Sequence, residues 1–190
     1  MRYQAYFCEE NIWHLCQDSR VQPFAPLVLF VSNEGGCCEL YAQRLAKPGG
    51  AVRWDYHVIL MTLGSAPLIW DLDSVMPFPT DAHAYLRSTF LPETPGVYRA
   101  RFRLLLGEHY LRHFCSDRSH MRDGSGWLKP APPWPPILAR EGVERWWLSA
   151  LLDFRRPSPG KLMELSDLLA FLALSANKKE DLLRVLGASS

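Results

Sequence analysis

Two apolar segments separated by a turn signal constrain the fold of this chain more than any other feature. Residues 53–62 and 67–73 are rich in β-branched, aromatic and other apolar residues, and Leu63-Gly64-Ser65-Ala66 lies between them. This pattern predicts an antiparallel hairpin. If the turn centres on its glycine, His57 lies directly opposite Asp71, at a separation of about 5 Å between Cβ atoms. The hairpin therefore predicts a hydrogen bond between imidazole and carboxylate, which a one-residue slip of the register would break.

Hydrophobic periodicity elsewhere in the chain predicts both strands and helices. Further strands are predicted over residues 26–32, 38–45 and 98–106, and helices over residues 9–20, 81–90, 108–114, 143–154, 163–173 and 178–186. Arginines alternate with apolar residues in 98–106, as in a half-exposed strand, while Asn177 and Gly187 are expected to begin and end the last helix. Residues 116–136 read as a long irregular loop, and such loops are often functional. The element order predicts an α+β fold with a mainly antiparallel sheet packed with helices, in a single domain spanning residues 1–190.

Composition excludes several classes of protein. The formal net charge of +1 gives no electrostatic basis for binding nucleic acid or an anionic membrane. The apolar runs at residues 25–31 and 168–174 are far shorter than the roughly 20 residues that cross a bilayer. Met1-Arg2-Tyr3-Gln4 lacks the apolar core of a secretion signal, and the five cysteines show no disulfide framework. These features predict reduced thiols in a cytoplasmic protein.

Cys8 is the candidate nucleophile. It immediately precedes Glu9-Glu10-Asn11-Ile12-Trp13, at the predicted start of the first helix. Helix N-termini lower a thiol pKa from about 8.5 and offer free N–H groups to a developing oxyanion. Cys16, in contrast, lies within the apolar stripe of the same helix. Cys8 and the His57–Asp71 pair together make a candidate Cys-His-Asp triad.

Several separated blocks of this sequence resemble the family of protein N-terminal glutamine amidohydrolases. They occur in the order of the family and span about residues 6–137 of the chain. The blocks are Tyr6-Phe7-Cys8-Glu9-Glu10-Asn11-Ile12-Trp13, Ser32-Asn33-Glu34, Trp54-Asp55-Tyr56-His57-Val58, Asp71-Leu72-Asp73, Pro77-Phe78-Pro79 and Ser116-Asp117-Arg118-Ser119-His120-Met121. Residues 35–46 and the region from about residue 140 onward depart from the family pattern.

The resemblance implies a monomeric, cofactor-free enzyme with a papain- and transglutaminase-like core. Such an enzyme converts the N-terminal Gln of proteins or peptides to Glu and releases ammonia; in eukaryotes the product is a substrate for arginylation, a step toward degradation. Carried over position by position, the catalytic triad of the family falls on Cys8, His57 and Asp71. These are the residues that the predicted hairpin and the first helix single out independently.

Specificity for a chain terminus requires recognition of a free α-ammonium group, and a carboxylate is its natural partner. By strand parity Asp55 and Asp73 share a face with His57 and Asp71. Glu9 and Glu10 adjoin the nucleophile, so all four of these carboxylates are candidates for substrate binding.

Other interpretations of the sequence predict different chemistry. His109, His113, Cys115 and His120 offer zinc-ligand residue types, but their spacing is irregular and the resemblance implies no metal. A related enzyme could deamidate an internal Gln of a specific protein or cleave a peptide bond. A protein of another class would bind chain N-termini without catalysis, although the joint presence of Cys8, His57 and Asp71 argues against it.

Overall fold

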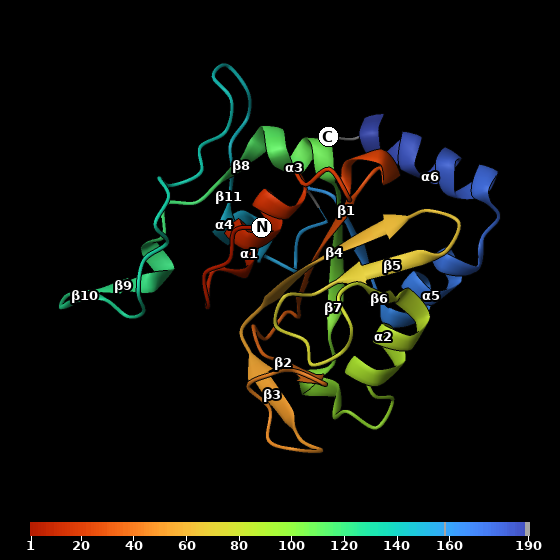
Figure 1. Ribbon diagram of the computed structural model, residues 1–190, viewed down its shortest axis with the longest axis horizontal. Coiled ribbons are helices and arrows are strands. Elements are labelled where there is room, and N and C mark those ends of the chain that lie inside the picture. Colours follow the sequence, from red (N-terminus) through yellow and green to blue (C-terminus); the bar gives the residue numbers. More distant parts are fainter. Residues whose placement is uncertain (158, 189–190) are drawn as a thin grey trace.

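A six-stranded sheet forms the centre of the protein, seen here in a computed structural model that describes residues 1–157 and 159–188 (Figure 1). All neighbouring strands within it run antiparallel. In spatial order the strands are β12 (Lys161–Met163), β7 (Arg101–Leu106), β1 (Leu27–Ser32), β4 (His57–Leu63), β5 (Pro67–Trp70) and β6 (Thr80–Asp81). The predicted α+β class with a mainly antiparallel sheet is confirmed.

Helices cover both faces of this sheet, because its central strands are apolar on both sides. Val28 and Phe30 of β1 face one core, together with α1 (Cys8–Leu15), α3 (Gly107–His113) and α4 (Leu148–Leu151). The alternate residues Leu27, Leu29 and Val31 face the other core, with α2 (Ala82–Thr89), α5 (Leu165–Ala173) and α6 (Ala176–Ala188). Each fully buried Leu, Val or Phe contributes about 1.5–3 kcal/mol, so both cores hold the sheet between helical layers.

The predicted hairpin is present, but its register is shifted. Leu60 pairs with Trp70, whereas a turn centred on Gly64 would pair it with Leu68. Leu63 stays in the strand and pairs with Pro67, so the turn holds three residues and centres on Ser65. The predicted register was wrong by two residues. An even shift keeps side chains on their faces, and His57 therefore remains on the same side as Asp71.

The segment predicted as one strand over residues 53–62 is broken in two. Its first part belongs to β3 (Ala51–Trp54), which pairs with β2 (Cys38–Tyr41) in a separate two-stranded sheet. Asp55 and Tyr56 then turn the chain into β4. β2 is shorter than its predicted range of residues 38–45 because Ala42 adopts a left-handed conformation with φ of 55°. α1 likewise ends at Leu15, well before residue 20.

Strand β7 is not half-exposed, contrary to the prediction for residues 98–106. It lies between β12 and β1, and Arg103 is completely buried. The C-terminal half of the chain covers this arginine, whose guanidinium donates hydrogen bonds to the backbone carbonyls of Leu151, Asp153, Arg156, Pro157 and Pro159. These five carbonyls provide hydrogen-bond partners for the buried guanidinium of Arg103, which the alternation of arginine and apolar residues predicted to face solvent.

The C-terminal half contains less helix than predicted. Within residues 143–154, Trp146 and Trp147 form β11 and pair in parallel with β8 (Phe114–Cys115), which leaves only α4 as helix. α6 runs from Ala176 to Ala188, so neither Asn177 nor Gly187 bounds it as expected. Gly187 instead lies close to Leu106. Among the described residues, none of the helices combines the length and apolar character of a membrane span.

The segment predicted as irregular, residues 116–136, contains two short elements. They are the 3-10 helix η3 (Ser119–Met121) and a small hairpin of β9 (Arg122–Asp123) and β10 (Gly126–Trp127). The hairpin projects from the body of the molecule on the side of α1 (Figure 1). Two further 3-10 helices, η1 (Gln22–Phe24) and η2 (Gly96–Tyr98), lie in connections.

Candidate active site

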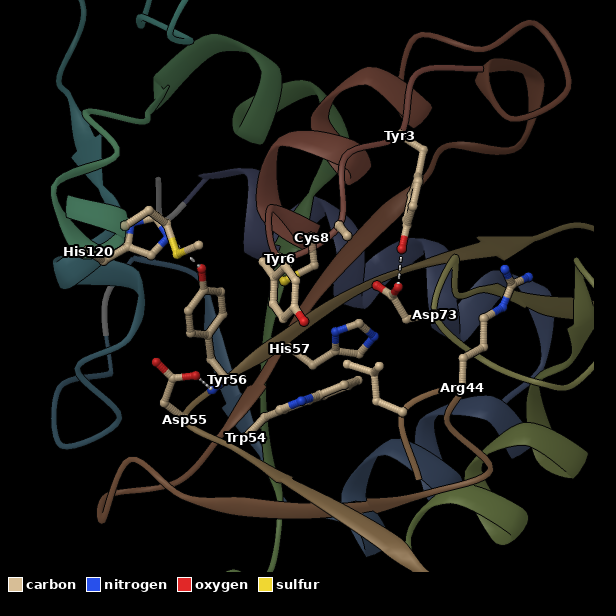
Figure 2. Close-up of a pocket in the computed structure, with 13 residues that line it drawn as sticks. Tyr3, Tyr6, Cys8, Arg44, Trp54, Asp55, Tyr56, His57, Asp73 and His120 are labelled. Atoms are coloured by element: carbon tan, nitrogen blue, oxygen red, sulfur yellow. Dashed lines mark hydrogen bonds between the residues drawn. The ribbon is translucent and has the colours of Figure 1, made fainter. Parts of the chain in front are cut away.

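A pocket of about 380 Å³ opens beside the first residue of α1 (Figure 2). Cys8 begins the helix and its side chain lines this pocket. The chain ahead of the helix is fixed by Asn11, whose side-chain amide both donates to the carbonyl and accepts from the N–H of Gln4, each at 2.8 Å. Phe7, between them, is fully buried. The position of the thiol is therefore set by α1 and by the turn that precedes it.

His57 and Asp71 form a buried pair at the wall of the pocket. His57 begins β4 and Asp71 follows the last residue of β5, and their Nε2 and Oδ1 atoms are 2.8 Å apart. The carboxylate also accepts hydrogen bonds from the Asp73 backbone N–H, the Gln43 amide and the Tyr85 hydroxyl. These four donors fix the Asp71 carboxylate, which in turn fixes the orientation of the imidazole.

The charges of this pair support one another. Burial opposes the imidazolium form of His57, but the charge and hydrogen bond of Asp71 outweigh it and raise the pKa of His57. Burial likewise opposes ionisation of Asp71, yet the His57 charge and the hydrogen bonds that the carboxylate accepts lower its pKa. Because Nε2 is bound to Asp71, the Nδ1 atom is the ring nitrogen available for chemistry. Trp54 packs against the ring with centroids 4.7 Å apart.

The pKa of the Cys8 thiol lies above its ordinary value in this environment. Burial raises its pKa first, and the negative charges of Glu9 and Asp73 raise it further. The expectation that the helix start lowers the pKa of Cys8 was wrong, because desolvation and neighbouring carboxylates outweigh the helix dipole. Figure 2 shows the sulfur and the His57 imidazole on the same pocket. A thiol of this kind needs an adjacent base to become nucleophilic.

Glu9 lies fully buried next to Cys8. Its Oε2 atom accepts a hydrogen bond of 3.0 Å from the Tyr56 hydroxyl, which is also 3.1 Å from Nε2 of His120. Within the described part of the chain its Oε1 atom has no hydrogen-bond partner, although the His120 ring nitrogen lies 3.6 Å away. Burial raises the pKa of Glu9 to about 7. This carboxyl group can therefore change its charge near neutral pH.

Glu10, like Glu9, is fully buried and does not line the pocket, whereas Asp55 and Asp73 do; Glu10 differs from Glu9 in its partners. Its oxygens accept hydrogen bonds of 2.6–2.8 Å from Ser116, from two nitrogens of Arg118 and from the Trp134 indole. Glu10 thus attaches the irregular segment 116–136 to α1.

Asp55 and Asp73 both line the pocket. Asp73 accepts a hydrogen bond of 2.6 Å from the Tyr3 hydroxyl, and Asp55 accepts one from the backbone N–H of Tyr56. The ligand atoms of His57, Asp71 and Asp73 lie within 4.8 Å of one another. The pocket wall therefore combines a thiol, an imidazole and two carboxylates.

The residues considered for zinc do not converge. His113 stacks on Trp146 and is hydrogen-bonded through Nδ1 to the Glu144 carbonyl. His109 contacts the same tryptophan, whereas His120 faces the pocket and Tyr56. In residues 1–157 and 159–188 the sole group with ligand spacing is the one formed by His57, Asp71 and Asp73.

Several residues of the site were not predicted from the sequence. Tyr3, Tyr6, Arg44 and Met121 line the pocket, and Gln43 and Tyr85 hold Asp71. Trp54 and Tyr56 lie close to His57 in the same sequence block, and this closeness to a predicted catalytic residue is the signal that could have identified them. Tyr6 and Met121 stand in blocks that resemble the family, next to Cys8 and His120, but their part in the pocket was not predicted. Tyr3, Arg44, Gln43 and Tyr85 reach the site across tens of residues of sequence, as in the contact from Tyr3 to Asp73, and no local pattern marks them.

A thiol at the start of a helix, sharing a pocket with a buried imidazole–carboxylate pair, is the arrangement used by cysteine-dependent hydrolases. The family model described as N-terminal glutamine amidase matches residues 3–172. The chain belongs to this family.

Relatives of known name agree with this assignment. The chain is 41% identical over 145 residues to a human protein N-terminal glutamine amidohydrolase, covering 71% of this chain and 70% of the relative. It is also 41% identical over 171 residues to the protein of that name from Drosophila virilis, covering 84% and 80%. The family match ends at residue 172, so α6 lies beyond it.

Proposed function

We propose that this protein hydrolyses the side-chain amide of an N-terminal Gln in proteins or peptides, giving Glu and ammonia. The observation that carries the proposal is the buried His57–Asp71 pair, which opens onto the same pocket as the Cys8 thiol. Family membership and the names of the relatives support the substrate class. The proposal includes a papain- and transglutaminase-like core, a monomeric state and catalysis without a cofactor. It also includes a cytoplasmic location, with which the five free cysteines are consistent.

The first half of the reaction forms a thioester. The Nδ1 atom of His57 takes the proton of Cys8 as the sulfur attacks the carboxamide carbon of the substrate. Asp71 stabilises the resulting imidazolium, in keeping with the raised pKa of His57. In this proposal the backbone N–H of Cys8, at the N-terminal end of α1, donates to the oxyanion, and one such donor is typically worth about 3 kcal/mol. Collapse of the intermediate breaks the C–N bond, and His57 protonates the departing ammonia.

The second half of the reaction regenerates the thiol. His57, now neutral, takes a proton from water as the water oxygen attacks the γ-glutamyl thioester. The C–S bond breaks, the product leaves with a terminal Glu, and the proton on His57 returns to Cys8. Each proton moves between groups that share the same pocket.

Recognition of the free α-ammonium group falls to carboxylates at the pocket. Asp55 and Asp73 line it, and Glu9 is buried next to Cys8 with an Oε1 atom that accepts no hydrogen bond from the described residues. Glu10 has its oxygens occupied by three side chains and serves the fold instead. An internal Gln would leave the recognising carboxylate without its ion pair, which disfavours its binding.

An ammonia-release assay on three matched peptides tests the proposal. The peptides begin with Gln, begin with N-acetyl-Gln, or carry the same Gln internally. We expect ammonia from the first peptide alone. Equal release from the internal Gln, or cleavage of the backbone, would instead establish an internal deamidase or a protease. Binding of the first peptide without any ammonia would establish a binding module and refute the proposal.

A further inference from the structure

Glu9 and Glu10 are adjacent in the first turn of α1, and both are fully buried, but their partners differ. Glu10 accepts hydrogen bonds from three side chains, and the Arg118 guanidinium among them neutralises its charge. Glu9 accepts a hydrogen bond from the Tyr56 hydroxyl, and no Lys or Arg among the described residues forms an ion pair with it. Because burying an ionised carboxylate without a charged partner is costly, these surroundings favour the carboxylate form of Glu10 and the neutral form of Glu9.

His120 is the one residue of the described chain at ion-pair distance from Glu9, with its Nε2 atom 3.6 Å from Oε1. Burial lowers the pKa of His120, so this ring is neutral at neutral pH. The other titratable groups that face Glu9 are Cys8 and Glu10 of α1, Tyr56 and His57 at the entry to β4, and Tyr110 of α3. Of these, His57 alone can become a cation, and Asp71 offsets its charge. Burial accordingly raises the pKa of Glu9 to about 7.

The hydrogen bonds around Glu9 leave one oxygen for a proton. The Tyr56 hydroxyl donates to Oε2 at 3.0 Å, and the same hydroxyl lies 3.1 Å from Nε2 of His120, whose ring N–H it can accept. Oε1 is buried and receives no hydrogen bond from any described residue. Leaving a charged oxygen without donors costs more than leaving a neutral hydroxyl in the same state. The proton of a neutral Glu9 therefore belongs on Oε1.

The Glu9 carboxyl group lies against the proposed nucleophile, with Oε2 3.7 Å from the Cys8 sulfur. When His57 removes the thiol proton, the sulfur becomes negative, and a second negative charge at this distance opposes that step. After burial, the charge of Glu9 is the largest influence that raises the pKa of Cys8. A neutral Glu9 removes this repulsion and keeps its hydrogen bond to Tyr56.

We propose that Glu9 is a positioning residue that acts in its protonated form, as a neutral carboxyl group beside the sulfur that lets His57 convert Cys8 to the thiolate. This inference rests on the proposed cysteine mechanism. The proton of Glu9 stays on its carboxyl group throughout, and the proton of Cys8 goes to His57. Loss of the Glu9 proton places a like charge beside the sulfur, so kcat/KM falls as pH rises through about 7. Recognition of the substrate α-ammonium group is then left to Asp55 and Asp73.

Glu9→Gln tests this inference, because the amide is neutral at every pH and can still accept from Tyr56. The measurement is kcat/KM for ammonia release from one Gln-initiated peptide, for variant and wild type, at about pH 6 and about pH 8. The substrate ammonium group titrates alike with both proteins, so its effect cancels in the ratio of variant to wild type. About nine tenths of wild-type Glu9 is protonated at the lower pH and about one tenth at the higher. We therefore expect the ratio to rise about tenfold between the two.

Tyr110→Phe is the matched control. The Tyr110 hydroxyl donates to the backbone carbonyl of Glu9 at 3.0 Å, not to its side chain, so its loss changes kcat/KM equally at both pH values. A second variant, Tyr56→Phe, removes the hydrogen bond that lowers the pKa of Glu9. This variant is expected to move the alkaline decline of kcat/KM to higher pH, whereas Glu9→Gln removes it.

A ratio of Glu9→Gln to wild type that does not change with pH would overturn the inference. A loss of kcat at both pH values would establish Glu9 as a base, and a raised KM alone would establish it as the ammonium ligand; both results overturn the inference. Alkylation of Cys8 by iodoacetamide, followed by mass spectrometry, reports the thiolate without turnover. We expect faster alkylation of Glu9→Gln than of wild type at about pH 8 and equal rates at about pH 6. That alkylation result together with no ammonia from any Gln-initiated peptide would refute the proposed function but not this inference.

Discussion

Replacing Asp71 by Asn removes a charge while preserving shape, which isolates the contribution of the His57–Asp71 pair. The carboxylate accepts from His57 and the Asp73 N–H on one oxygen, and from Gln43 and Tyr85 on the other. An amide can keep its oxygen toward His57 and turn its NH2 toward the other two partners. Among the described residues, no donor reaches the buried side-chain oxygen of Gln43, so a flip of that amide lets this oxygen accept the new donor. The variant is therefore expected to fold.

The expected loss in rate follows from removing the negative charge of Asp71, which stabilises the His57 imidazolium. Removing one partner of a buried, hydrogen-bonded charge pair costs about 3–5 kcal/mol, and each 1.36 kcal/mol in the barrier is tenfold in rate. We expect kcat for Asp71→Asn to fall by about 10² to 10⁴ in the ammonia-release assay. The charge of Asp71 raises the pKa of His57, so its removal lowers that pKa and moves the acid limb of the pH–rate profile to lower pH.

Tyr85→Phe is the matched control for Asp71→Asn. It removes one donor to the same carboxylate but leaves the charge, so its effect on kcat is expected to stay within about tenfold. If Asp71→Asn retained kcat within tenfold of wild type and an unshifted acid limb, His57 would not depend on this carboxylate. The assignment of Asp71 to the triad would then be rejected.

Three further predictions follow from the same site. Cys8→Ala abolishes ammonia release without loss of the circular-dichroism signal; turnover near the wild-type rate would exclude Cys8 as the nucleophile. Glu9 has a pKa of about 7 in the folded protein against an ordinary value of 4.5, so folding favours its protonated form. The free energy of unfolding therefore declines by about 3 kcal/mol as pH rises from about 4.5 through 7. Glu9→Gln should remove this decline when it is compared with wild type by urea unfolding at about pH 5 and about pH 8; an equal decline in both proteins would contradict the prediction. Glu10→Gln leaves Arg118 buried without its carboxylate and is expected to cost about 3–5 kcal/mol in unfolding free energy, measured by the same method; a cost under about 1 kcal/mol would show that the pair is dispensable.

The parts of the site that depend on local sequence patterns could be predicted. Cys8 could be placed because helix periodicity begins directly after it, and His57 and Asp71 because strand parity survives an even shift of register. Sequence could not supply the contacts made across the chain. The bonds from Glu10 to Ser116 and Arg118 span more than a hundred residues, and nothing near Glu10 distinguishes it from Glu9.

The errors in the predicted fold have physical causes of the same kind. Alternation of arginines with apolar residues in β7 indicated one polar face, but only tertiary packing decides whether that face meets water or a covering segment. Trp146 and Trp147 have helical periodicity with their neighbours, yet they pair with β8 because that pairing extends the core around Phe114. Burial also reversed the expected shift of the Cys8 pKa, a quantity that no sequence pattern reports.

The attachment of Glu10 to Ser116, Arg118 and Trp134 has a consequence for the order of events during synthesis. The thiol and the imidazole–carboxylate pair are all translated within the first 71 residues. Met121 and His120, which complete the pocket, are carried by the segment that Glu10 anchors. A nascent chain therefore contains the thiol and the imidazole–carboxylate pair before it contains the residues that complete the pocket wall and attach to Glu10.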